Sequence, residues 1–147
     1  MSYTHKKGYW RYANIRMDIT GLESFDKYLQ ALPNEITQKV LVEELTQVAK
    51  DTAEVAKSNC RAWTKRRSGR LERGYKWTPA RVKKDGTVKS SVYNQVFYAS
   101  FVEFGTSRSA AIPILRSAAI ETTLFLGKRL AERTKKVLTD HVVGGEE

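Results

Sequence analysis

The chain has 147 residues and a formal net charge of +10, and hydrophobic residues make up 41% of it. This length fits one domain with a real core, and the ordinary composition argues against wholesale disorder. A single cysteine, Cys60, excludes an internal disulfide framework and fits a reducing compartment. No apolar run is long enough to span a bilayer, and residues 1–12 lack the apolar core of a secretory signal. We expect a soluble protein made in a cytoplasm, with no membrane partner.

The chain begins with a polar, basic and aromatic stretch, residues 1–12, which we expect to be a flexible arm that contacts a neighbouring subunit through Trp10. Residues 15–19 alternate apolar and charged side chains, which predicts a short strand. The apolar spacing over residues 22–32 predicts a short amphipathic helix. From about residue 35 to residue 63 the same spacing continues without a helix-breaking residue, which predicts one long helix.

The positive charge is concentrated in the segment that follows. Residues 57–89 hold twelve Lys and Arg against two acidic residues, whereas the rest of the chain holds fourteen of each. Such a concentration is typical of a surface that contacts polyanions or an acidic partner, although a charged segment can also be merely solvated. The cations that we expect to contact a partner or DNA are Lys65, Arg66, Arg67, Arg70, Arg73, Lys76, Arg81, Lys83 and Lys84.

The middle of the chain has the pattern of a sheet. The long helix ends in cations followed by Gly69, a residue that tolerates a left-handed conformation. A strand region begins at Tyr75, and the Asp-Gly pair at residues 85–86 predicts a tight hairpin. Aromatic and β-branched residues alternate up to Phe104, so residues 92–104 are predicted to form a long strand.

The last part of the chain is predicted to be a second long helix, from Pro113 to about residue 139, with residues 141–147 as a flexible tail. Its apolar face comprises Leu115, Ala119, Leu126, Leu130 and Val137. Together these elements predict a single α+β domain over residues 13–140. One antiparallel β-sheet would pack against the long central helix and the long C-terminal helix, with an extended basic hairpin or loop over residues 64–90.

Residues 98–115 also carry a recognisable motif. The segments Tyr98-Ala99, VEFGT at residues 102–106, Ala111-Ile112-Pro113 and Leu115 follow the pattern YAxxVEFGT…AxPFLxxA. This pattern resembles the gene-ten-like family of neck and tail-completion proteins of tailed bacteriophages. Weaker likeness at residues 20–22 and 68–71 extends the resemblance over residues 15–135. The family tends to have Phe where this chain has Ile114, and Thr where it has Ser68.

The resemblance implies a structural virion protein at the head–tail junction, where it would complete the tail and join it to the head. It implies a homo-oligomeric ring of six or twelve copies, with neighbouring neck, connector and tail-tube proteins as partners. A tail terminator or a minor tail protein at the same junction is an alternative. Outside this family, the cations interleaved with Trp63, Tyr75 and Trp77 would also suit a nonspecific nucleic-acid-binding module, and such a loop could contact packaged DNA.

Several residues of the motif are candidates for fixing the fold or forming a subunit interface. These are, with the arm residue Trp10, Tyr98, Phe101, Glu103, Phe104, Gly105, Thr106 and Pro113. A strand would place Glu103 on the side of Phe97 and Phe101, where an unpaired buried carboxylate is costly. We favour an intrachain partner, either an arginine or the backbone N–H groups of residues 105–109, over a salt bridge between subunits.

No catalytic or metal-binding motif is present in the sequence. Its two histidines, His5 and His141, fall in the two predicted tails, and a lone Cys60 offers no paired ligand. The carboxylates of Glu43, Glu44 and Asp51 fall on the polar side of the long helix, where solvation is the expected role. We therefore expect no enzyme activity, no metal and no cofactor.

Overall fold

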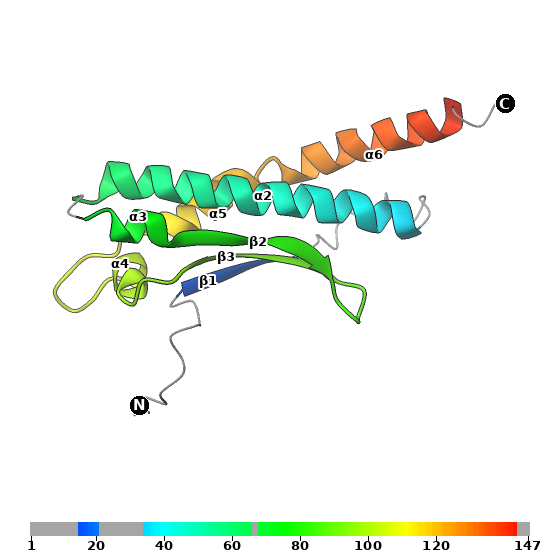
Figure 1. The fold of residues 1–147 in the computed structure, drawn as a ribbon. Coiled ribbons are helices and arrows are strands. Elements are labelled where there is room, and N and C mark those ends of the chain that lie inside the picture. Colours follow the sequence, from blue (N-terminus) through cyan, green and yellow to red (C-terminus); the bar gives the residue numbers. More distant parts are fainter. Residues whose placement is uncertain (1–14, 21–33, 66–67, 144–147) are drawn as a thin grey trace.

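The computed structural model describes residues 15–20, 34–65 and 68–143 (Figure 1). In chain order the elements are β1 (Ile15–Thr20), α2 (Asn34–Trp63), α3 (Arg70–Gly74), β2 (Tyr75–Val82), β3 (Val88–Asn94), α4 (Ala99–Phe104), α5 (Ile114–Thr123) and α6 (Leu126–Val143). The predicted α+β class is confirmed, as are the short first strand, the long central helix and the hairpin. The predicted arm with Trp10 and the helix predicted over residues 22–32 lie outside the described residues.

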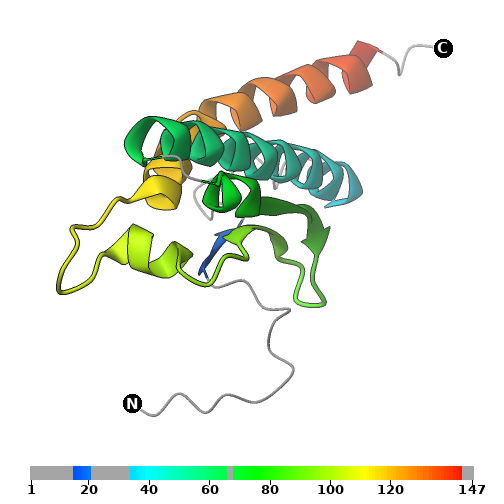
Figure 2. The same cartoon turned by 60° about the vertical axis from the view of Figure 1, so that its left-hand side comes forward.

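The three strands form one antiparallel sheet in the order β1-β3-β2. Helix α2 crosses one face of the sheet, and α5 and α6 lie on the same side (Figures 1 and 2). The hairpin between β2 and β3 closes as the sequence predicts: Lys83 N–H donates to Thr87 O over 2.8 Å, and Asp85 accepts from the Thr87 N–H over 2.9 Å. Gly69 has the expected left-handed conformation, with φ of 68°, and begins α3.

The core lies between α2, the sheet and α5. On α2 the buried residues are Leu45, the neighbours Val48 and Ala49, then Ala53 and Ala56, which gives successive intervals of three or four positions, as a single buried helix face requires. The alanines leave room for close packing of the sheet and of α5. The core is closed from the other side by side chains of the strands and α5, among them Tyr75, Val92, Leu115 and Ala118.

The long strand predicted over residues 92–104 is wrong, because β3 ends at Asn94. The fully buried Asn94 side chain accepts a hydrogen bond from Val96 N–H and donates one to Leu71 O, each over 2.9 Å. An Asn side chain that bonds the backbone two residues ahead mimics a turn and ends a strand. The chain then turns into α4, so the apolar residues after Val96 follow a helical period instead of a period of two.

The single C-terminal helix predicted from Pro113 to residue 139 is also wrong, because the helix is interrupted between α5 and α6. The hydroxyls of Thr122 and Thr123 donate to the carbonyls of Ala118 and Ala119 over 2.9 and 2.6 Å. Such back-bonding competes with the helical ladder and bends helices. The apolar face predicted for this C-terminal helix is nonetheless buried or partly buried in both α5 and α6. Helix α6 continues to Val143, into the predicted tail.

Helix α6 is held on α2 by ion pairs. Arg133 lies 2.7 Å from Glu44 and 2.5 Å from Glu43, and Arg129 lies 3.2 Å from Glu44. Glu44 is 3% exposed, so the solvated role expected for it is wrong. A buried carboxylate needs such partners, since an unpaired one would be strongly destabilising.

Candidate interaction surfaces

Helix α4 separates the motif residues into two sets. Ala99, Val102 and Glu103 lie at positions i, i+3 and i+4 and are buried or partly buried. The exposed set, which we call the aromatic face, consists of Phe101 and Phe104 of α4 and of Phe97, which precedes the helix. Phe101 is 57% exposed and Phe104 is 65% exposed. Exposed aromatic side chains grouped on one helix are typical of protein contact sites.

Glu103 joins α4 to α5. Its side chain is 3% exposed, and its two carboxylate oxygens accept hydrogen bonds from the N–H groups of Leu115 and Arg116, each over 2.9 Å. The first N–H groups of a helix have no partner within the helix and carry a partial positive charge, which a carboxylate stabilises. Glu103 therefore contacts the start of α5 within the chain, rather than the backbone of residues 105–109.

The turn between the two helices is tightly shaped. Gly105 has φ of 76° and ψ of −179°, a conformation that essentially only glycine adopts. A Cβ atom there would lie 2.8 Å from Ala111 N and 2.9 Å from Ser109 O. Beyond it, Thr106 N–H donates to Ser109 O over 2.8 Å, and Pro113 occupies the position just before α5. These residues fix where α4 lies.

The exposed apolar surface continues from α4 along α5. The guanidinium carbon of Arg116 lies 5.7 Å from the centre of the Phe104 ring, a cation–π distance. Ile120 and Leu124 follow Arg116 at intervals of four residues and are exposed, and Phe125 is exposed beside them. Sequence reasoning missed these three residues because they fall within the apolar spacing of a helix, which also predicts burial.

A groove of about 450 Å³ lies between the end of α2 and α4. Apolar or aromatic walls come from Trp63, Tyr98, Val102 and Ile112, and the buried Cys60 also lines the groove. Burial raises the pKa of the Cys60 thiol. A raised pKa keeps the thiol protonated and therefore weakly nucleophilic. The groove suits packing of a side chain better than covalent chemistry.

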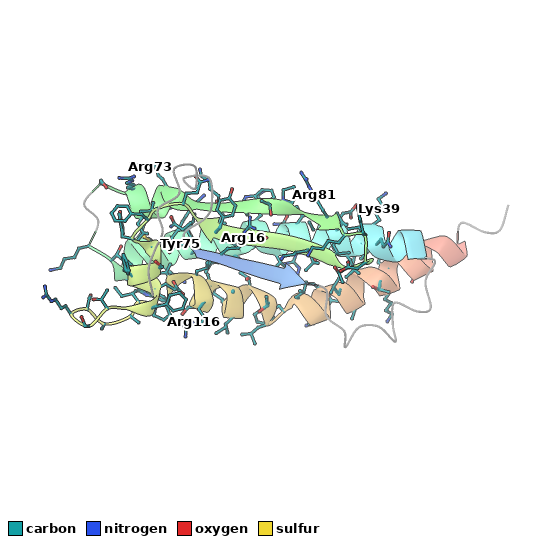
Figure 3. All side chains as sticks on the ribbon, turned by 90° about the horizontal axis from the view of Figure 1, so that it is seen from below. Arg16, Lys39, Arg73, Tyr75, Arg81 and Arg116 are labelled. Atoms are coloured by element: carbon teal, nitrogen blue, oxygen red, sulfur yellow. The ribbon has the colours of Figure 1, made fainter. Side chains whose placement is uncertain are left out.

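The predicted basic segment does not form one cluster. Lys65 follows α2, Arg70 and Arg73 belong to α3, and Arg66 and Arg67 lie outside the described residues. The remaining four predicted cations are Lys76 and Arg81 of β2 and Lys83 and Lys84 of the hairpin turn. All seven described cations are exposed. Figure 3 shows Arg73 and Arg81 towards opposite ends of the β2 side of the sheet.

Arg16 of β1 also contributes to the basic surface, although sequence reasoning left it out. β1 and β2 flank β3, and Arg16 and Lys76 are both paired with Tyr93. The guanidinium carbon of Arg16 lies 5.7 Å from the centre of the Tyr93 ring. Only the strand order brings Arg16 next to the basic segment, so its position along the chain held no signal.

Within the described ranges, no helix is long and apolar enough to cross a membrane. The same part of the chain contains no group of three or more His, Cys, Asp or Glu residues that could hold a metal ion. The surfaces that stand out are the exposed apolar surface of α4 and α5 and the basic surface of the sheet. They belong to a small α+β protein.

The family of this protein is shown by its sequence. Residues 23–105 match the HK97-gp10-like family, which is described as "Bacteriophage HK97-gp10, putative tail-component". Because this match covers more than half of the chain, the chain belongs to that family and is a bacteriophage tail component, a structural protein of the virion. The resemblance drawn from the motif is thereby confirmed. No curated protein and no solved structure matches the chain.

Proposed function

We propose that this protein acts without catalysis and forms a homo-oligomeric ring of six or twelve copies at the head–tail junction of the phage. In this role it completes the tail and joins it to the head, with neck, connector and tail-tube proteins as neighbours. The observation that carries the proposal is the aromatic face of α4 in a chain that belongs to a tail-component family. Burial of side chains as large as Phe101 and Phe104 by a partner lowers the free energy of the assembly, because apolar surface is removed from water.

The position of the aromatic face supports a specific contact rather than a loose one. Glu103 holds α4 against α5 by two hydrogen bonds inside the chain, and Gly105 permits the tight turn that follows α4, so the face is presented on a fixed element. A rigid surface loses little conformational freedom when it binds, which favours assembly. A ring requires that one patch meets a different patch of the next copy. The groove beside Tyr98 offers such a second patch, in which apolar side chains stand beside the cations Arg61, Lys65 and Arg70.

Assembly is tested by the mass of the purified full-length chain in solution, measured by light scattering. We expect Phe101→Ser to reduce the mass towards that of a monomer. The matched control is Val82→Ser, which removes an exposed apolar side chain from β2, away from α4, and should leave the mass unchanged. If the unaltered chain is a monomer in solution and also does not bind purified tails, the proposal is contradicted.

The place of action is tested in the parent phage with a stop codon at Trp10, by negative-stain electron microscopy of the lysate. Filled heads beside unattached tails are the expected result. Overlong or misshapen tails would instead assign the protein to tail termination, the second candidate at this junction. Normal infectious virions would contradict both roles.

A further inference from the structure

One face of the sheet is covered by α2 and the other is not covered by any described helix (Figures 1 and 3). In β3 the residues Val88, Ser90, Val92 and Asn94 alternate and are each at most 3% exposed, while Ser91 between them is also buried, at 6%. The Ser90 hydroxyl donates to Leu45 O of α2 over 3.2 Å. Alternate side chains of a strand lie on opposite faces. Lys89, Ser91 and Tyr93 therefore lie on the face that points away from α2.

The strand register gathers cations on this second face. Arg16 of β1 and Lys76 of β2 flank Tyr93, and Arg81 of β2 is paired with Lys89. Residues paired across neighbouring strands share a face of the sheet. We call the set Arg16, Lys76, Arg81 and Lys89 the cationic sheet face. One acidic position, Asp18, is paired with Ser91 in the same register, so positive charge is in excess.

A bulge in β2 is what aligns Lys76 with Arg81. The two residues are five positions apart, an odd number, and in a regular strand they would lie on opposite faces. Between Thr78 and Arg81 the register shifts, so that two residues of β2 oppose one of β3. The bulge is held by Ala80, whose N–H donates to the Thr46 hydroxyl of α2 over 2.9 Å. The partners Tyr93 and Lys89 are four apart, so both cations share the face.

Three of the charges on this face are available to a ligand. Arg16, Lys76 and Arg81 are exposed, and within the described part of the chain none of the three forms an ion pair. Neighbouring strands are about 4.8 Å apart and residues rise about 3.3 Å along a strand, so the four cations span roughly 10 by 13 Å. Along one DNA strand, about 13 Å of helix axis contains about four phosphates.

We propose that the cationic sheet face binds the phosphate backbone of duplex DNA without sequence preference. Duplex phosphates are favoured over unpaired bases because Arg16 already lies over the Tyr93 ring, the aromatic platform on which a base would stack. Lys83 and Lys84 in the hairpin turn extend the charge beyond the end of the sheet. This inference does not depend on the proposed ring, because the face lies within one copy.

The test is binding of the full-length chain to a short labelled DNA duplex of arbitrary sequence, measured by fluorescence anisotropy over a series of NaCl concentrations. We expect the affinity to fall steeply with salt, with a slope of about −0.9 per phosphate contacted. The double variant Lys76→Gln and Arg81→Gln should bind more weakly and make the slope shallower by about 2. The matched control is Lys128→Gln with Lys135→Gln, which removes two exposed charges from α6 and should leave the slope unchanged.

Several results would overturn the proposal. An equal loss of DNA affinity in the two double variants would show attraction by net charge alone. If the duplex does not bind at all, the cations would have only the role of discouraging strand pairing at the β2 edge. Tighter binding of single strands, unaffected by the β2 double variant, would assign base stacking elsewhere. Poly-glutamate binding that requires Lys76 and Arg81, without duplex binding, would assign the face to an acidic protein.

The same samples separate this test from the proposed assembly. Thermal unfolding checks that both double variants are folded, and light scattering gives their mass. An unchanged mass with lost DNA binding supports the cationic sheet face whether or not a ring forms. A reduced mass with equal DNA affinity per chain would contradict the face and place Lys76 and Arg81 in a subunit contact.

Discussion

Helix α4 and the second face of the sheet lie in the same small domain, yet they distribute charge in opposite ways. The sheet exposes Arg16, Lys76 and Arg81 on one face and buries Val88 and Val92 of β3 on the other, as a half-covered sheet normally does. In α4 the carboxylate of Glu103 is buried and the aromatic side chains are exposed. The difference indicates that the backbone hydrogen bonds at α5, together with the packing of Ala99 and Val102, decide which side of α4 faces inward.

This comparison predicts that the greatest loss of stability comes from the buried carboxylate. We expect Glu103→Ala to lower the free energy of unfolding by about 3 kcal/mol, because two N–H groups of α5 lose their acceptor. The measurement is chemical denaturation. The control is Glu121→Ala, an exposed glutamate of α5, whose effect should stay within about 0.5 kcal/mol. A Glu103→Ala chain with unchanged stability but lost assembly would move Glu103 to a subunit interface.

The turn that holds α4 should be nearly as sensitive. Gly105→Ala is expected to cost about 2 to 3 kcal/mol, because it adds backbone strain and a close contact with the backbone of Ala111. Gly86 in the hairpin has a similar φ of 83°, but nothing lies within 4 Å of a Cβ placed there. Gly86→Ala should therefore cost only about 1 kcal/mol. Equal losses in denaturation would show that the contact with Ala111 is relieved by movement of the turn.

Salt should separate the two surfaces. Burial of the aromatic face involves little charge, so raising NaCl is expected to leave the mass of the assembled protein unchanged while it abolishes binding of duplex DNA. Light scattering and anisotropy on the same samples measure the two effects. Dissociation of the assembly at high salt would indicate that charged residues, rather than Phe101 and Phe104, hold the copies together.

The smallest effect at neutral pH is expected for Tyr75, the buried first residue of β2. Burial raises the pKa of its phenol above the usual value of about 10, a hydrogen bond with Asn94 acting in the opposite direction. Above about pH 10 the unfolded chain releases this proton and the folded chain retains it, so stability falls as pH rises. Tyr75→Phe should change the unfolding temperature little at pH 7 and reduce its decline at alkaline pH. An unchanged decline would mean that other groups cause it.

Much of the fold followed from local patterns in the sequence. The spacing of apolar residues in α2, the turn residues at 85–86 and the alternation in β1 each concern neighbours along the chain, and all three predictions agree with the structure. The motif from Tyr98 to Leu115 was likewise enough to indicate the phage family. It did not give the conformation of its own first half, because Phe97 to Phe104 satisfies both a period of two and a helical period.

Composition and local spacing were therefore enough to predict the class of fold and the long helix, and the likeness of the motif was enough to indicate the family. The end of β3 at Asn94 could not be predicted in this way, because the backbone partner of that side chain, Leu71, lies 23 residues earlier in the chain. The tertiary structure also determines that Glu103 caps α5 and that Arg16 joins Lys76 on one face. These outcomes depend on which distant segments meet, and the periodicity of a single element contains no information about its neighbours in space.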